Sequence, residues 1–368
     1  MADSWFTNTV IYALDVETFS DSDGDGIGDF RGLRDKLDYV SDLGVGCLWL
    51  TPFYESPNRD NGYDVTDHCA VDPRLGTLAD FDTICREVHD RGLRVVVDLV
   101  VNHTSDQHPW FRESRTDPAS PLRTFYRWSA VPVPPAEASV FRDPANTSVW
   151  TFDDVPERFY RHQFYEFQPD LATGDPAVQR AIRETMAFWL DRGVDGFRVD
   201  AARHLGGRTD GTHYEETSPH DVLKVMRRFG DARRPGSMLM GESDAEPDHL
   251  IDFFGNGDEL QLIQNFLLDN FLMLALAREE SEPVARVLAA LPEPPGTAPC
   301  QWANFLRNFD ELDLERLSDE EREEVYAAFA PDPAMRIYGR GIRRRLAPML
   351  GGDQRRIALA FSLLMTLP

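Results

Sequence analysis

Short apolar segments alternate with amphipathic helical segments along this 368-residue chain, and this rhythm limits the folds available to it. The segment RVVVDLVVNH (94–103) is apolar on both faces, as buried strands of parallel sheets are. Six further segments predict strands: VIYALDV (10–16), GCLWLT (46–51), GFRVD (196–200), SMLMGE (237–242), LQLIQNF (260–266) and QWANFLRNFD (301–310). Helical patterns follow most of them, as at 30–44 and 175–193. Repeated strand–helix units predict an α/β fold with a parallel sheet.

Residues 103–171 interrupt this rhythm, because they are rich in proline, aromatic and polar residues. Two stretches in particular predict loops: DQHPWFRESRTDPASP (106–121) and VPVPPAEASV (131–140). We interpret 103–171 as a subdomain inserted after the third strand, between barrel segments 1–102 and 172–368. The fold class is then a (β/α)8 TIM-type barrel that stops before its eighth strand, since only seven strands are predicted.

The net charge of −25 excludes several classes of partner. It argues against nucleic acid and against an anionic membrane surface. No apolar run is long enough to cross a bilayer, and the N-terminus lacks the pattern of a signal peptide. The four cysteines have no metal-binding spacing, so we expect free thiols and a cytoplasmic protein. The oligomeric state is not predicted.

The stretch DSDGDGIGDF (21–30) has the spacing of a cation-binding loop. Five residues match positions 1, 3, 5, 9 and 6 of a calcium loop: Asp21, Asp23, Asp25, Asp29 and Gly26. Gly32 stands where such a loop has its bidentate Glu, which argues against a helix–loop–helix calcium site. A hard-cation loop, with the Ile27 carbonyl as a further ligand, is one interpretation; an ordinary solvated Asp-Gly turn is the other.

Three acidic residues follow predicted strands: Asp200, Glu242 and Asp310. The carboxyl ends of parallel barrel strands meet at one rim, where such folds carry their active sites. Two carboxylates flanking a sugar linkage are the minimum for retaining glycoside chemistry. Arg198 shares a strand face with Asp200, and its charge is expected to favour the ionised carboxylate. Each acid alone could form a structural ion pair or a helix cap; together they predict an active site.

Five motifs, in order, resemble those of the α-amylase family of glycoside hydrolases and transglucosidases: DLVVNH, QPDL, GFRVDAARH, GESD and NFDE. DSDGDGIGDFRG and DNGYDV are similar to its α-glucosidase and trehalose synthase branch. Four longer stretches look most like trehalose synthases, which interconvert maltose and trehalose: CLWLTPFYESP, NHTSDQHPWFRESR, FLRNFDEL and GIRRRLAPML. The resemblance covers essentially the whole chain.

The resemblance implies a role for each catalytic acid. Asp200 would be the nucleophile and Glu242 the general acid/base, while Asp310 would hold two hydroxyls of the sugar at the cleavage subsite. Arg198 would orient Asp200.

The resemblance also implies substrate contacts. His103 would bond the 6-hydroxyl of that sugar, Tyr63 would form its stacking floor, and Asp60 would bind its far end. His204 would make a weaker contact. Without the resemblance, His103 and Tyr63 could equally be core residues whose polar atoms are hydrogen-bonded within the protein.

For the aspartate loop the resemblance implies a structural calcium ion. Asn102 matches a second calcium ligand of α-amylases, and a buried Asn that satisfies loop backbone groups is the alternative.

The chain departs from the family pattern in two respects. Phe309 stands where relatives have a sugar-binding histidine. The chain also stops at FSLLMTLP, where relatives continue into the eighth strand and a C-terminal β-domain. We expect either a truncated fragment or a shortened derivative of the fold.

The sequence thus predicts an enzyme that acts on maltose, trehalose or short α-glucosides through a covalent glucosyl intermediate on Asp200. A plain α-glucosidase or oligosaccharide hydrolase is the alternative enzyme. A non-catalytic relative that binds carbohydrate is the alternative from another class.

Overall fold

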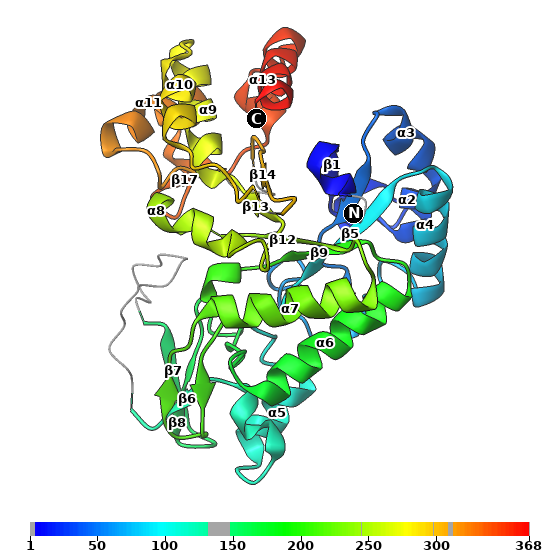
Figure 1. Ribbon diagram of the computed structural model, residues 1–368, viewed down its shortest axis with the longest axis vertical. Helices are drawn as coiled ribbons and strands as arrows, with labels where there is room; N and C mark the ends of the chain where they lie inside the picture. Colours follow the sequence, from blue (N-terminus) through cyan, green and yellow to red (C-terminus); the bar gives the residue numbers. More distant parts are fainter. Residues whose placement is uncertain (1–3, 132–147, 244, 297, 308–311, 368) are drawn as a thin grey trace.

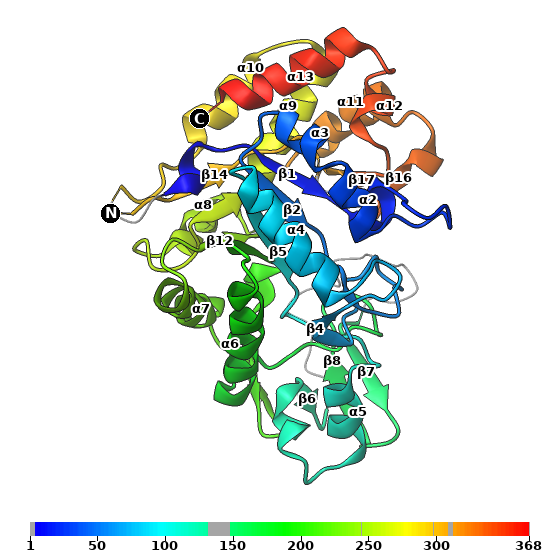
Figure 2. The same cartoon turned by 90° about the vertical axis from the view of Figure 1, so that its right-hand side faces the viewer.

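A computed structural model describes residues 4–131, 148–243, 245–296, 298–307 and 312–367. Its centre is a parallel sheet of seven strands in the order β1-β2-β5-β9-β12-β13-β14 (Figures 1 and 2). The strands are β1 (Ile11–Leu14), β2 (Cys47–Leu50), β5 (Arg94–Leu99), β9 (Gly196–Val199), β12 (Met238–Gly241), β13 (Leu262–Gln264) and β14 (Gln301–Ala303). Each lies inside a predicted strand segment. The prediction of a partial (β/α)8 barrel is confirmed.

Helices connect and cover the strands: α2 (Phe30–Asp35), α3 (Leu37–Asp42), α4 (Leu78–Asp90), α6 (Pro176–Asp191), α7 (Pro219–Arg233), α9 (Phe266–Arg278), α10 (Glu282–Ala290), α11 (Asp319–Phe329) and α13 (Gln354–Thr366). Local sequence fixes their starts. The Thr77 side chain caps α4 in a reciprocal capping box with Asp80. Asp175 caps α6, whose first residue is proline. The predicted helix 30–44 is two helices, because the helical backbone is interrupted at Lys36.

The side chains of the sheet alternate between two apolar clusters, as a period of two requires. Leu48 and Leu50 pack in the large cluster between sheet and helices. Cys47 and Trp49 pack in a smaller cluster with Val96 inside the curved sheet. The same alternation places the polar residues of β5 and β9 on this inner face. The sheet therefore presents its few buried charges to one enclosed space.

The predicted insertion contains an antiparallel sheet, in the order β6 (Trp128–Ser129), β8 (Arg158–Arg161) and β7 (Trp150–Asp153), at the bottom of Figure 1. It also contains helix α5 (Pro109–Thr116), so the loop prediction for 106–121 is wrong over these residues. The His108 side chain accepts from the backbone N–H of Trp110, and Pro109 occupies the first helical turn. These two features start a helix that the polar composition obscured. Of the second predicted loop, residues 132–140 lie outside the described residues.

Two smaller elements carry residues of the site. The hairpin β3 (Tyr54–Glu55) and β4 (Asp67–Val71) holds the loop 56–66. A three-stranded sheet near the end of the chain has the order β15 (Leu312–Asp313), β17 (Gly341–Ile342) and β16 (Arg336–Ile337). Among the helices that the structure describes, none has both the length and the apolar character needed to cross a membrane.

An aromatic cluster joins the 56–66 loop to the sheet–helix core. Phe53 precedes this loop and is 1% exposed. Its ring centroid lies 4.9 Å from Phe81, 5.3 Å from Trp189 and 5.5 Å from Phe30. This cluster therefore connects α2, α4 and α6 beneath the loop.

We expect Phe53→Ala to lower the free energy of unfolding by about 3–5 kcal/mol, because it leaves a cavity in this cluster. Urea unfolding followed by fluorescence measures the change. Tyr39→Ala is the control, since Tyr39 is 53% exposed and should cost far less. Equal effects of the two substitutions would contradict the importance of the cluster.

Candidate active site

A buried guanidinium lies among three carboxylates at the carboxyl ends of neighbouring strands. Arg198 Nη1 is 2.6 Å from Asp98 Oδ1 and 2.6 Å from Asp200 Oδ1, and Nη2 is 2.7 Å from Glu242 Oε1. The Arg198 side chain is 1% exposed. Since β9 and β12 pair in parallel, Asp200 and Glu242 follow paired strand ends and meet at one rim. The structure thus brings together two of the predicted acids and the predicted arginine.

Burial and charge oppose each other at Asp200. Burial raises the pKa of Asp200 above its ordinary value, and the Arg198 charge lowers it by less. The expected effect of Arg198 is therefore present but outweighed. Burial likewise lowers the pKa of Arg198, but the carboxylates of Glu242 and Asp98 outweigh it and raise that pKa well above the ordinary value. Arg198 therefore carries a positive charge.

Asp98 belongs to this cluster and was missed by the sequence analysis. It accepts hydrogen bonds from Trp49 Nε1 at 2.8 Å and from Arg198 Nη1 at 2.6 Å. Burial raises the pKa of Asp98 to about 7, against the lowering effect of Arg198. An acid in the middle of an otherwise apolar strand was the available signal, because a buried charge needs a partner.

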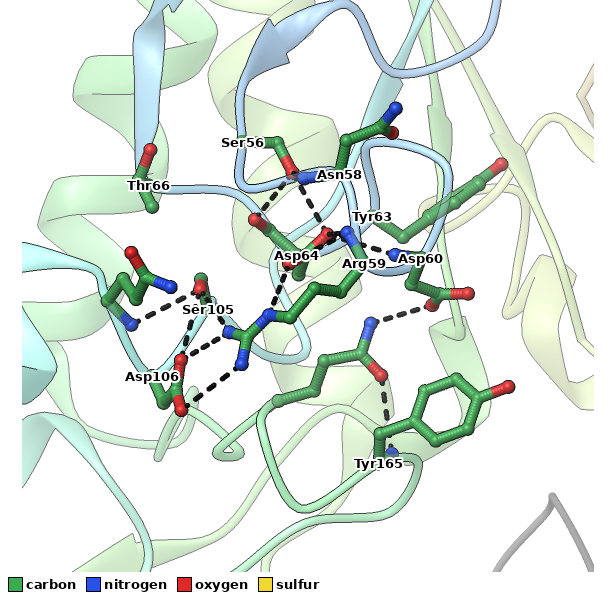
Figure 3. Close-up of polar contacts among 12 residues, drawn as sticks. Ser56, Asn58, Arg59, Asp60, Tyr63, Asp64, Thr66, Ser105, Asp106 and Tyr165 are labelled. Atoms are coloured by element: carbon green, nitrogen blue, oxygen red, sulfur yellow. Dashed lines mark hydrogen bonds and ion pairs between the residues drawn. The ribbon is translucent and has the colours of Figure 1, made fainter.

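The loop 56–66 carries Asp60 and Tyr63 to the same cavity (Figure 3). Buried Asp64 organises the loop, accepting from the backbone N–H of Arg59 at 3.1 Å and of Asp60 at 3.2 Å. Asp60 Oδ2 accepts from Gln168 Nε2 at 2.7 Å. Burial raises the pKa of Asp60 above its ordinary value. Gln168 belongs to the predicted QPDL motif, but its contact with Asp60 was not foreseen.

Two histidines face the cavity as neutral rings. His103 Nε2 lies 3.2 Å from the Tyr63 carbonyl oxygen, and its ring contacts Phe164 edge to face at 5.2 Å. The His204 ring also contacts Phe164 edge to face, at 5.9 Å. Burial lowers the pKa of His103, and burial lowers that of His204 well below its ordinary value. Neutral imidazoles can donate to or accept from sugar hydroxyls.

One cavity of about 2170 Å³ brings most of these groups together. The predicted site residues along it are Asp60, Tyr63, His103, Arg198, Asp200, His204 and Glu242. The cavity continues between β1 and β14, where apolar side chains of α13 line it. Asp310 and Phe309 lie outside the described residues, so their predicted roles stay predictions. A buried arginine, paired acids and neutral hydrogen-bonding rings form a site suited to an uncharged polyhydroxylated ligand.

The aspartate loop gathers three carboxylates on the surface. Asp21, Asp23 and Asp29 each offer an oxygen within 4.8 Å of the others. Backbone N–H groups of Gly24 and Gly26 lower the pKa of Asp21, so this carboxylate is ionised. This donor set fits a hard divalent cation, which prefers carboxylate oxygens.

Like Asp21, Asp23 and Asp29, the other members of the predicted cation site have protein partners. Asp25 Oδ1 accepts from the Ile27 backbone N–H at 2.8 Å, as in an Asp-Gly turn. Asn102 Nδ2 donates to Asp170 Oδ1 at 3.3 Å, while Asn102 Oδ1 is buried without a hydrogen-bond partner among the described residues. Roles as ligands for Asp25, Ile27 and Asn102 stay predictions.

Comparison with known proteins shows the family to which the chain belongs. A family model described as "Alpha amylase, catalytic domain" matches residues 12–291. The chain is 46% identical to "Trehalose synthase/amylase TreS" of Mycolicibacterium smegmatis, over 99% of this chain and 62% of that protein. It is 47% identical to an oligo-1,6-glucosidase of Parageobacillus thermoglucosidasius, over 61% of this chain and 42% of that protein. The crystal structure of an α-amylase from H. orenii superposes with a TM-score of 0.77 at 28% identity, covering 98% of this chain and 67% of that one. The chain therefore spans less than two thirds of either curated relative.

If the aspartate loop holds calcium, chelation should lower the melting temperature by about 3 °C or more, because the bound ion offsets repulsion among the carboxylates. Differential scanning calorimetry with and without chelator measures the shift. Asp21→Ala should reproduce it and remove the response to chelator. Asp35→Ala, which changes an exposed acid at the end of α2, is the control. An unchanged melting temperature in chelator would support the ordinary turn.

Proposed function

The chain belongs to the α-amylase family of glycosidases and transglucosidases, and from that premise we propose that it interconverts maltose and trehalose. One observation carries the proposal: Arg198 joins Asp200 and Glu242 in a single cavity lined by the polar groups expected to bind a glucosyl unit. The similarity to a protein named trehalose synthase over 99% of this chain favours this reaction among those of the family.

In the proposed mechanism Asp200 attacks C1 of the non-reducing glucosyl unit of maltose. The C1–O bond breaks as Glu242 protonates the departing glucose oxygen, and a glucosyl ester forms on Asp200. Glucose then presents its own anomeric hydroxyl to C1. Glu242 removes that proton, the ester bond breaks, and the product is trehalose. Attack by water instead yields a second glucose.

The surroundings of the two carboxylates suit these different roles. The Asp200 side chain is 8% exposed, whereas that of Glu242 is 23% exposed. A proton donor benefits from contact with solvent, because it must be reloaded in each cycle. The nucleophile benefits from a fixed position, which Arg198 supplies. Asp98, which binds Arg198 but does not itself line the cavity, serves as a positioning residue for that guanidinium.

Hydrolysis of short α-glucosides is the second candidate reaction. The similarity to an oligo-1,6-glucosidase favours it, over a smaller share of this chain. Both reactions begin with the same ester and differ in whether glucose or water attacks it. A non-catalytic role in carbohydrate binding accounts less well for the grouping of Arg198, Asp200 and Glu242 at one rim. Incubation of the protein with maltose, followed by chromatographic measurement of trehalose and glucose, separates the three candidates.

We expect Asp200→Asn to reduce turnover of maltose by about 10⁴-fold, because an amide cannot form the glucosyl ester. Initial rates measure the loss, and circular dichroism checks that the fold persists. Asp90→Asn, an exposed position on α4, is the matched control and should keep its activity. Near-normal turnover by Asp200→Asn would exclude this residue as nucleophile.

Activity should also decline on the acid side at a higher pH than for an ordinary aspartate. Burial raises the pKa of Asp200, and only the ionised carboxylate attacks C1. The acid limb of kcat/KM against pH should therefore have its midpoint above about 4, the ordinary value. Full activity at that pH would contradict the assignment of the buried carboxylate.

A further inference from the structure

Two tyrosines from distant parts of the chain meet beside the cavity. Tyr165 belongs to the predicted insertion, and Tyr338 belongs to the turn between β16 and β17. Their hydroxyl oxygens are 3.4 Å apart, although 173 residues separate them in sequence. Both side chains line the cavity, and their neighbours Glu166 and Gly339 are exposed. The pair therefore bridges two parts of the molecule at the edge of the cavity.

Tyr165 is held by neighbours that include Gln168, which also binds Asp60. Its ring stacks on Phe167 at 4.9 Å with an interplanar angle of 9°, and the guanidinium of Arg59 lies 4.3 Å over that Phe167 ring. The Tyr165 backbone N–H donates to Gln168 Oε1 at 3.3 Å. The other end of the Gln168 amide donates to Asp60 Oδ2. One buried side chain thus connects Tyr165 with a predicted sugar-binding carboxylate.

Tyr338 is held on the opposite side by an unusual turn. Its φ of 53° lies in the left-handed region, and Gly339 follows with a φ of 68°. Few residues with a bulky side chain adopt this conformation, which is found most often where function maintains it. Arg340 then anchors the turn, donating from Nε to Asp313 Oδ2 at 2.7 Å. The turn presents the Tyr338 ring to the cavity from a fixed base.

We infer that Tyr165 and Tyr338 determine the fate of the sugar released in the first half of the reaction. This inference rests on the proposed function. Transfer requires that glucose stay beside the glucosyl ester and turn until another hydroxyl faces C1, while water is kept away. A hydroxyl pair that bridges the cavity edge obstructs both the departure of glucose and the entry of water. A hydroxyl–hydroxyl contact of 3.4 Å is weak enough to open in each cycle.

Tyr165→Phe and Tyr338→Phe test this role, because each keeps the ring and removes one partner of the contact. With maltose as substrate, each variant should raise the ratio of free glucose to trehalose by about fivefold, the effect of one lost hydrogen bond. The double variant should match either single variant, since both changes break the same contact. Tyr326→Phe is the control, because its buried hydroxyl has no hydrogen-bond partner among the described residues. Melting temperatures confirm that each variant is folded.

The possible results separate this inference from the proposed function. If the unaltered protein makes trehalose and neither variant changes the ratio, the inference is overturned and the proposed function stands. If the unaltered protein makes only glucose, the proposed interconversion fails, and inhibition by added glucose becomes the test. A higher inhibition constant in Tyr165→Phe and Tyr338→Phe than in Tyr326→Phe would then support the bridge. Equal inhibition constants would overturn it.

Discussion

The site depends on the ion pairs and hydrogen bonds that the Arg198 guanidinium makes. Four strands of the sheet, two on each side of β9, supply the neighbours named here. Trp49 of β2 lies beneath it at 5.5 Å, Asp98 of β5 and Glu242 after β12 bind it, and Gln264 of β13 accepts from its Nε at 3.3 Å. Arg198 itself comes from β9. Taking such a charge out of water is costly, and the surrounding carboxylates offset that cost only in this arrangement. The same contacts therefore pack the barrel interior and position the acids of the site.

The loop 56–66 is likewise organised by one buried charged group. Its backbone N–H groups at Arg59 and Asp60 converge on the carboxylate of Asp64, so the loop is ordered from within. The Arg59 side chain then reaches the insertion through Asp106 and Phe167. As a result, the loop that carries Asp60 and Tyr63 is attached both to the barrel and to the insertion. A ligand that contacts Asp60 therefore binds where the barrel and the insertion meet.

Sequence periodicity located all seven strands of the sheet, because buried parallel strands are continuous apolar runs that few other structures produce. It also placed Asp200 and Glu242 correctly, since strand ends in such a sheet share one rim. The motif resemblance then supplied roles that the periodicity could not. Helix α5 was missed because its start depends on a cap by His108, a residue that seldom signals one.

The sequence analysis did not predict the long-range contacts of the site. The bonds of Asp98 to Arg198 and of Gln168 to Asp60 join residues 100 and 108 positions apart, and no local pattern encodes such pairings. The balance between burial and charge at Asp200 was equally hidden, because it depends on the depth of the site as well as on its neighbours. Sequence therefore identified Arg198, Asp200 and Glu242 as members of the cluster, and the packing sets the direction of the pKa shifts at Arg198 and Asp200.

The raised pKa of Asp200 has a consequence for ligand binding. This carboxyl lines the cavity, whereas Asp98, which also binds Arg198, is already fully buried. A sugar that expels water from the cavity removes the remaining solvent around Asp200 and further disfavours its charged form. The complex will then take up protons from solution, although the sugar itself carries no charge. Calorimetric heats of binding will accordingly depend on the ionisation enthalpy of the buffer, and the apparent affinity will vary with pH through the protein alone.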